Sequence, residues 1–145
     1  MTEYRVERIV SIEQVQSHAS FLLKVGDEVS EMYGNKFDWE NFALYKYAWT
    51  NWLVICKKGG KPVGLMAARL FGSIFDDKTK ILYQDLLYAQ PGTRAAKYLL
   101  ESFIDFGKSN ADHIISCIGQ KSNIKPRSLE KKGFVKLEEL YRIEV

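Results

Sequence analysis

The chain is poor in cysteine and has no long apolar run, and each scarcity narrows the class of protein. Two cysteines among 145 residues are too few for a disulfide framework. Cys56 and Cys117 both lie in apolar, strand-like runs, which indicates buried free thiols in a reducing compartment. No stretch reaches the roughly 18 apolar residues of a membrane span, and the first residues lack a basic segment followed by an apolar one. We therefore expect a cytoplasmic protein with no membrane partner.

Charge of one sign is also scarce. Lysine and arginine number 21 and aspartate and glutamate 18, so the formal net charge is only +3. Because basic residues are interleaved with acidic ones and form no long block, a nucleic-acid partner is disfavoured. The two histidines, His18 and His113, have no Cys, Asp or Glu at the spacing of a zinc site. We expect no metal and place both histidines at surface or edge positions.

The composition otherwise fits one globular domain. Hydrophobic residues make up 46% of the chain and aromatic residues 13%, and a chain of this length should bury roughly two-thirds of its unfolded surface. The three prolines lie at element boundaries, and no repeat or linker interrupts the sequence. We therefore predict a single domain over residues 1–145, either a small α/β enzyme or a binding module.

Apolar periodicity predicts an alternation of strands and helices. The predicted strands cover residues 4–10, 52–58, 63–74, 81–89, 113–118 and 134–145. The predicted helices cover residues 12–26 with a further turn or two after them, a segment starting at Asp38, residues 93–108 and residues 126–132. Strands separated by one helix favour a parallel crossover, so the sheet should be mixed, antiparallel first and parallel around the helix at 93–108.

The segment Leu86–Leu100 carries the strongest local signal, because an apolar strand runs through a short loop of small residues into an amphipathic helix. The unpaired amides at a helix N-terminus and the helix dipole favour an anion, and the small side chains let a phosphate approach the backbone. Arg94 and Lys97 would add side-chain charge. The alternative is an ordinary strand-to-helix junction, which needs the same small residues for packing.

This segment resembles the acyl-coenzyme A loop of the GNAT acetyltransferase superfamily, whose pattern is Gln/Arg-x-x-Gly-x-Gly/Ala. Ala96 occupies the last Gly/Ala place, Arg94 the middle glycine place and Pro91 the Gln/Arg place, while Gln90 lies one residue earlier. One of the three defined positions therefore matches, and the backbone amides are independent of the substitutions.

Two later segments extend the resemblance. SLEKKGF, from Ser128 to Phe134, is similar to the superfamily's LYxKxGF, and Gly133–Tyr141 resembles the closing strand of small, often phage-encoded members. The resemblance implies the α/β (α+β) GNAT fold, with a mixed, mostly antiparallel sheet of about six to seven strands flanked by about four helices.

The resemblance also implies acetyl-coenzyme A as co-substrate, with no metal. The pantetheine arm would pair with the strand ending at Ala89 in the manner of an added strand, and the pyrophosphate would bind the amides after it. The residues that the resemblance assigns to this co-substrate are Leu87, Tyr88, Ala89, Gly92, Thr93, Arg94, Ala95, Ala96, Lys97 and Asn123.

Acetyl transfer to an amine needs a base and gains from an acid. Asp85 is the candidate base, although an alternating strand would also place it in solvent. The family's usual acid is a tyrosine on the last helix, where this chain has Leu129. Tyr141 and Tyr88 are substitutes by residue type, and an amphipathic tyrosine at the core edge is the alternative for both.

The resulting prediction is an N-acetyltransferase that moves an acetyl group from acetyl-coenzyme A to a primary amine by direct attack. The alternative is a GNAT-like domain without turnover that binds coenzyme A or serves a structural role, and a nucleic-acid-binding module is a third reading. The acceptor, a small molecule or a protein amine, is not specified by the sequence, and a homodimer is one of the oligomeric states left open. The acceptor pocket is expected in the aromatic-rich segment before Trp52.

Overall fold

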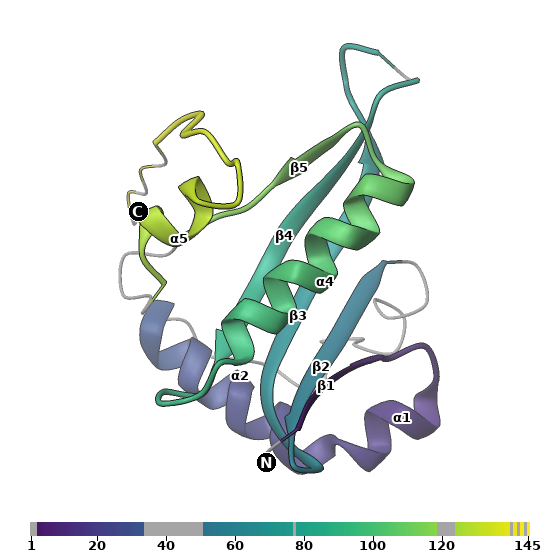
Figure 1. Ribbon diagram of the computed structural model, residues 1–145, viewed down its shortest axis with the longest axis vertical. Coiled ribbons are helices and arrows are strands. Elements are labelled where there is room, and N and C mark those ends of the chain that lie inside the picture. Colours follow the sequence, from purple (N-terminus) through teal and green to yellow (C-terminus); the bar gives the residue numbers. More distant parts are fainter. Residues whose placement is uncertain are drawn as a thin grey trace.

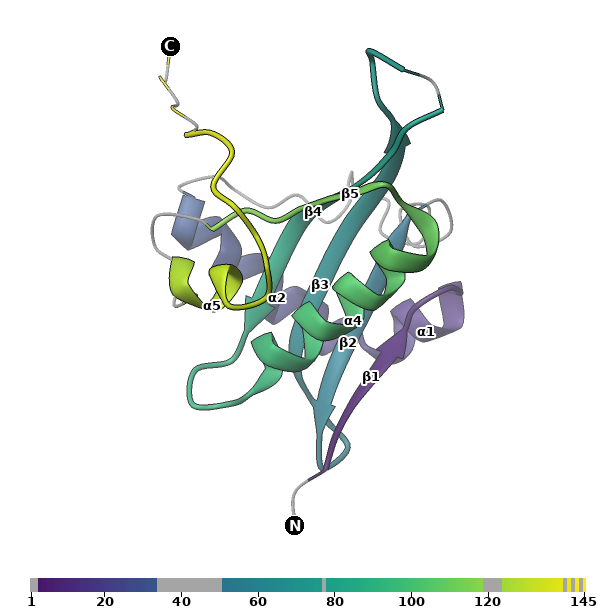
Figure 2. The same cartoon turned by 45° about the horizontal axis from the view of Figure 1, so that its top comes forward.

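The computed structural model describes residues 3–33, 51–76, 78–118 and 124–139, together with Tyr141, Ile143 and Val145. The described residues form one sheet with helices on both faces (Figures 1 and 2). In chain order the elements are β1 (Tyr4–Arg8), α1 (Ile12–Ser17), α2 (Ala19–Tyr33), β2 (Trp52–Lys58), β3 (Lys61–Gly72), β4 (Lys80–Ala89), α4 (Ala95–Asn110), β5 (His113–Ile115) and α5 (Pro126–Glu130). The predicted helix from Asp38 and the aromatic residues around it lie outside the described residues.

The sheet is mixed, as the sequence predicts. Its described strands follow the order β1-β2-β3-β4-β5. Neighbours are antiparallel from β1 to β4, and β4 pairs with β5 in parallel. The connection between the two parallel strands is α4, which crosses one face of the sheet (Figure 2).

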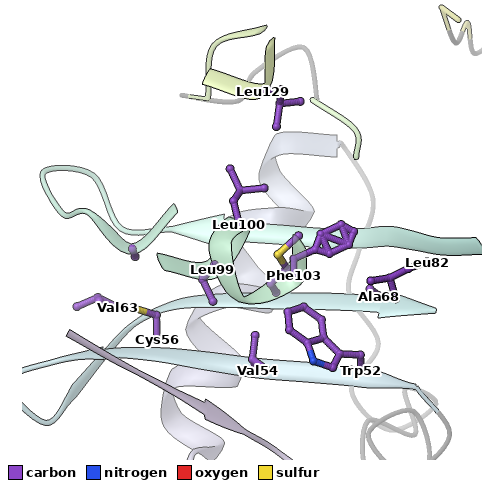
Figure 3. Close-up of a cluster of buried hydrophobic side chains, with 12 residues drawn as sticks. Trp52, Val54, Cys56, Val63, Ala68, Leu82, Leu99, Leu100, Phe103 and Leu129 are labelled. Atoms are coloured by element: carbon purple, nitrogen blue, oxygen red, sulfur yellow. The ribbon is translucent and has the colours of Figure 1, made fainter. Parts of the chain in front are cut away.

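One hydrophobic core lies between α4 and the sheet (Figure 3). Its buried residues are Trp52, Val54, Cys56, Val63, Met66, Ala68, Leu82, Ala95, Leu99, Leu100, Phe103 and Leu129. Two glycines let the helix approach closely. A Cβ on Gly64 of β3 would lie 2.9 Å from Ala95 Cβ, and one on Gly107 of α4 would overlap the Ile114 side chain. These contacts fix both ends of α4 on the sheet, because no side chain fits there.

A second core lies on the other face, between α2 and the sheet. Its buried residues are Ile9, Phe21, Leu22, Val25, Leu53, Ile55, Leu65, Ala67 and Tyr88. The helical segment before it begins at Ser11, whose hydroxyl accepts from the Gln14 amide at 3.2 Å while the Gln14 side chain accepts from the Ser11 amide at 3.1 Å. These two reciprocal hydrogen bonds form a capping box.

The helix predicted over residues 12–26 is two helices, and His18 occupies the break between them. Its placement corrects the expectation of a surface or edge position, because the residue is only 8% exposed. Nδ1 lies 2.7 Å from the Gln14 carbonyl oxygen and Nε2 lies 3.7 Å from the Glu7 carboxylate. Lys57 holds that carboxylate at 2.7 Å and lowers the Glu7 pKa. The Gln14 carbonyl oxygen and the Glu7 carboxylate are the polar partners that allow His18 to be buried there.

The C-terminal part of the sheet differs from the prediction. The strand expected over residues 113–118 ends at Ile115, and the described residues of 134–145 contain no strand. Five strands are therefore present in the described part, against the six to seven expected. The apolar side chains of Val135, Leu137 and Tyr141 are exposed, so the alternating pattern of this segment has no described sheet to pack on.

Candidate functional site

The main feature of the sheet is a fork between its two parallel strands. The last pair of the ladder joins Tyr83 to Ile115, whereas β4 continues to Ala89. Figure 1 shows β5 leaving β4 and leading toward α5, while β4 runs on toward the start of α4. Within the described part of the chain, the far half of β4 therefore has an edge that no strand covers.

A β-bulge marks the point where the fork opens. Ala67 of β3 pairs with Leu86, whereas the next residue, Ala68, pairs with Gln84. Asp85 is therefore an extra residue on β4, two positions beyond the end of the parallel ladder. Bulges of this kind bend a strand and re-aim its side chains, which is why they recur beside active sites.

The backbone of β4 beyond the bulge presents polar groups at the open edge. The Gln90 amide donates to the Val63 carbonyl oxygen at 2.8 Å, and hydrogen-bonded positions alternate along an antiparallel pair. Tyr88 therefore bonds toward β3, while the N–H and C=O groups of Leu87 and Ala89 face the fork. The Tyr88 side chain is buried against Phe21. Burial and a hydrogen bond with Glu28 raise its pKa.

The open edge leads to the N-terminus of α4. Gly92 has a φ of +80°, a backbone conformation that suits glycine, and the Thr93 hydroxyl donates to the Gln90 carbonyl oxygen at 2.6 Å. Among the described residues, the amides of Gly92, Ala96 and Lys97 have no acceptor. The sequence predicted free amides from Gly92 to Lys97, but those of Thr93, Arg94 and Ala95 donate to the Gln90 carbonyl oxygen, the Tyr4 hydroxyl and the Thr93 hydroxyl. The three that remain free lie at or just before the first turn of α4, where the helix dipole favours an anion.

Residues from the first strand and the first hairpin also reach this loop. The Arg94 amide donates to the Tyr4 hydroxyl at 3.0 Å, and the Tyr4 ring stacks on Tyr98 at 4.8 Å. The Lys58 ammonium lies 5.8 Å from the Tyr4 ring centroid, and that of Lys97 lies 5.7 Å from the Tyr98 ring. Sequence reasoning missed Tyr4 and Lys58, which come together only because β1 pairs with β2.

Asp85 lies in a polar and aromatic cluster on the sheet. Its side chain is 24% exposed, and both carboxylate oxygens accept from Nε of Arg69, at 2.8 and 3.0 Å. The Arg69 guanidinium lies 5.7 Å from the ring centroids of both Phe71 and Tyr83. The Cys117 sulfur lies 3.5 Å from the Tyr83 hydroxyl oxygen. The Tyr83 pKa is raised, because a thiolate at Cys117 would accept from the neutral phenol and repel a phenolate.

Gln84 is the third residue that sequence reasoning missed. It is only 7% exposed, and its side chain crosses the base of the fork. Nε2 donates to the Cys117 carbonyl oxygen at 3.0 Å, while Oε1 accepts from the Ser116 hydroxyl at 2.5 Å and from the Cys117 amide at 3.4 Å. A polar residue inside an otherwise apolar strand is the signal that points to it.

The remaining candidates lie away from this arrangement. Leu129 is 9% exposed and packs against the α4 core (Figure 3). Tyr141 is 88% exposed, and its hydroxyl donates to Glu139 at 2.6 Å, which raises its pKa. A role of Tyr141 as acid stays a prediction. Asn123 lies outside the described residues.

Neither a metal site nor a membrane-spanning helix is found among the described residues. No group of three or more His, Cys, Asp or Glu side chains in them is placed to hold a metal ion. None of the described helices is both long and apolar enough to cross a membrane.

No protein-family model and no curated protein matches the sequence. Solved structures match over nearly the whole chain. A transcriptional regulator from Bacillus halodurans C-125 is 12% identical with a TM-score of 0.72, over 99% of this chain and 100% of that one. An aminoglycoside acetyltransferase from an uncultured soil metagenomic sample is 13% identical with a TM-score of 0.72, over 98% and 95%. A GNAT family acetyltransferase from Staphylococcus aureus is 14% identical with a TM-score of 0.65, over 99% and 98%.

These likenesses define the fold. The chain has the mixed α/β fold of the GNAT acetyltransferases, as the resemblance in its sequence implied. At identities of 12 to 16% the agreement concerns architecture, and the chemistry has to be argued from the site of this chain.

Proposed function

We propose that the protein is an N-acetyltransferase that moves an acetyl group from acetyl-coenzyme A to a primary amine. The observation that carries the proposal is the fork between β4 and β5, whose open edge leads directly to the unpaired amides at the start of α4. One end of the site is suited to an extended amide-containing chain and the other to a polyanion. Coenzyme A combines these two chemical features in one molecule.

The residues that would hold the co-substrate follow from this geometry. Main-chain groups of Leu87 and Ala89 would pair with the pantetheine amides in the manner of an added strand. The amides of Gly92, Ala96 and Lys97 would bind the pyrophosphate, which the positive end of the α4 dipole also favours. The small side chains of the loop, at Gly92, Thr93, Ala95 and Ala96, would leave room for this approach. Arg94, Lys97 and Lys58 would add positive charge around it.

The bulge residue, Asp85, would act as the base of the reaction. An ammonium has no lone pair, so the acceptor amine must first lose a proton, to Asp85 or to a water bound by it, before its nitrogen attacks the thioester carbonyl. The C–N bond forms, an amide of β4 stabilises the oxyanion, the nitrogen gives up a second proton to solvent, and the C–S bond then breaks. A thiol with a pKa near 8 to 9 can leave as the thiolate, which takes up a proton from solvent. The reaction therefore does not depend on a tyrosine at the position of Leu129.

A second candidate function is a domain that binds coenzyme A without turnover. It is favoured by Leu129, which occupies the place of the family's acid and is packed into the core. In this reading the Arg69–Asp85 pair stabilises the bulge and does not act as a base.

Titration calorimetry with acetyl-coenzyme A, followed by an assay for released thiol over a panel of amines, tests both readings. The panel should include a polyamine, an aminoglycoside, a lysine peptide and a peptide with a free N-terminus. We expect binding in the micromolar range and thiol release with at least one class. Absence of binding at millimolar acetyl-coenzyme A would refute the proposal, whereas binding without thiol release from any amine would support the domain without turnover.

A further inference from the structure

The base of the fork is the point where the pairing of β4 with β5 stops, after Tyr83 and Ile115. Where the ladder ends, the next pair in register would bring Gln84 against Ser116. A main-chain pair at that point would extend the sheet and close the fork by one residue at each strand. The structure instead has a buried side chain between the two backbones.

Gln84 takes over the hydrogen bonds that the missing ladder would have made. A carboxamide both donates and accepts, so a single side chain serves the carbonyl oxygen of Cys117 at 3.0 Å and its amide at 3.4 Å. The Ser116 hydroxyl adds a third contact at 2.5 Å. Buried main-chain groups need such partners, and a side chain that supplies them keeps the strands farther apart than direct pairing would.

The position of Gln84 in the chain links this brace to the site. It directly precedes the bulge residue Asp85 and lies opposite Ala68. The edge groups of Leu87 and Ala89 begin a few residues beyond it on the same strand. Movement of Gln84 toward Ser116 would therefore change both the width of the fork and the direction of the bulge.

We propose that Gln84 is a positioning residue that braces the fork open, and that it thereby sets the affinity for the pantetheine arm of the acetyl donor. This inference rests on the proposed function. It assigns to Gln84 no contact with the reacting atoms.

Three variants test the brace. Gln84→Leu keeps the approximate volume and removes all three hydrogen bonds, and Gln84→Asn keeps the carboxamide on a side chain one methylene shorter. The control is Val25→Ala, which opens a cavity in the core between α2 and the sheet. Gln84 is not among the residues of that core. The control should be compared with a Gln84 variant of similar melting temperature, so that general destabilisation is matched.

We expect both Gln84 variants to bind coenzyme A about five- to tenfold more weakly, the loss typical of one to two hydrogen bonds. In turnover the KM for acetyl-coenzyme A should rise more than kcat falls. The Cys117 amide should exchange its hydrogen faster in Gln84→Leu than in the wild-type protein. Val25→Ala should change the affinity less than about twofold at the same loss of stability.

Two results would overturn the inference in distinguishable ways. If the wild-type protein binds coenzyme A and Gln84→Leu binds it equally well, the brace has no role and the proposed function stands. If the wild-type protein does not bind coenzyme A, the proposed function falls and this inference falls with it.

Discussion

Arg69 donates through a single nitrogen, Nε, to both carboxylate oxygens of Asp85, across the bulge that opens the sheet. The guanidinium is also placed against two aromatic rings, Phe71 on its own strand and Tyr83 on the next. The ion pair and the two ring contacts hold the Asp85 carboxylate beside the bulge. Variants of the two residues therefore test whether Asp85 acts as a base or only as one half of a structural ion pair.

Replacement of Asp85 separates these two roles. In Asp85→Asn the side chain keeps its size and loses its capacity to accept a proton, so kcat at neutral pH should fall by about 100-fold, the lower range for a general base. Coenzyme A affinity should change by less than about twofold. The measurement is steady-state kinetics with the best amine, together with calorimetry.

Arg69→Lys is the companion variant. A lysine keeps the charge and cannot reproduce the orientation given by a guanidinium, so we expect a loss of activity smaller than that of Asp85→Asn. Unchanged turnover in Asp85→Asn, combined with a lower melting temperature, would remove Asp85 from the mechanism and leave it a structural residue.

If the amides at the start of α4 bind the pyrophosphate, the effect of an added negative charge on coenzyme A affinity should depend strongly on its position along α4. Ala96→Glu places a carboxylate beside the amides of Ala96 and Lys97, where it would compete with and repel a pyrophosphate. Coenzyme A affinity should fall by at least about tenfold, as one lost charge-assisted hydrogen bond would produce. Calorimetry at low and high salt measures it, and the difference should shrink as salt screens the charges.

Ser109→Glu is the matched control, since it adds the same charge at the exposed opposite end of the same helix. The two sites lie about 20 Å apart at 1.5 Å per residue, roughly two Debye lengths at physiological ionic strength. Equal affinities of Ala96→Glu and Ser109→Glu would show that the anion site lies elsewhere.

The close approach of α4 to β3 predicts a steric coupling. A Cβ on Gly64 would lie 2.8 Å from Leu99 Cδ1, 2.9 Å from Ala95 Cβ and 3.1 Å from the Tyr88 carbonyl oxygen. Gly64→Ala should therefore lower the free energy of unfolding by about 1 to 3 kcal/mol, the usual cost of overpacking. Urea denaturation gives the value.

The double variant Gly64→Ala/Ala95→Gly tests the reason for that loss. Removal of the Ala95 methyl relieves one of the three contacts, so the double variant should be more stable than the sum of the two single effects. Strict additivity would mean that the helix shifts away from the sheet and that the contact with Ala95 is not the cause.

The elements with strong local periodicity were predictable from the sequence. β2 was predicted over the residues that it occupies, and α4 within two residues at each end, because a continuous apolar run and a 3.6-residue stripe are local signals. The prediction of a strand over residues 134–145 is wrong for the described residues of that range, for the same reason. Their alternation is typical of a strand, whereas strand formation depends on a partner edge that no local pattern specifies.

The site itself depends on contacts between distant parts of the chain. The loop 90–97 and Asp85 could be proposed because they lie in one continuous segment. The Arg94 amide and the Tyr4 hydroxyl are 90 residues apart in sequence, and Gln84 and Cys117 are 33 apart. Such pairs become visible only once the order and register of the strands are known, so Tyr4, Lys58 and Gln84 escaped prediction.

The two cysteines give the last prediction, because both are free thiols in very different surroundings. Cys56 is fully buried in the α4 core, and burial raises the pKa of its thiol to about 11. A thiol whose pKa is raised stays protonated at pH 8, and the thiolate is the reactive species.

Cys117 is half-buried at the base of the fork, two residues beyond the end of β5. A maleimide at pH 8 should therefore label Cys117 in the native protein and leave Cys56 unmodified until the protein is unfolded. Because the proposed pantetheine path runs along the same fork, a coenzyme A analogue should slow the labelling of Cys117 at least about fivefold at roughly ten times its calorimetric Kd. The coenzyme's own thiol consumes maleimide and its disulfide would exchange with Cys117, so a thioether analogue is the appropriate probe. Cys117→Ser is the control for site assignment by mass spectrometry. Labelling of Cys117 at the same rate with and without a bound analogue would place the arm of the co-substrate outside the fork.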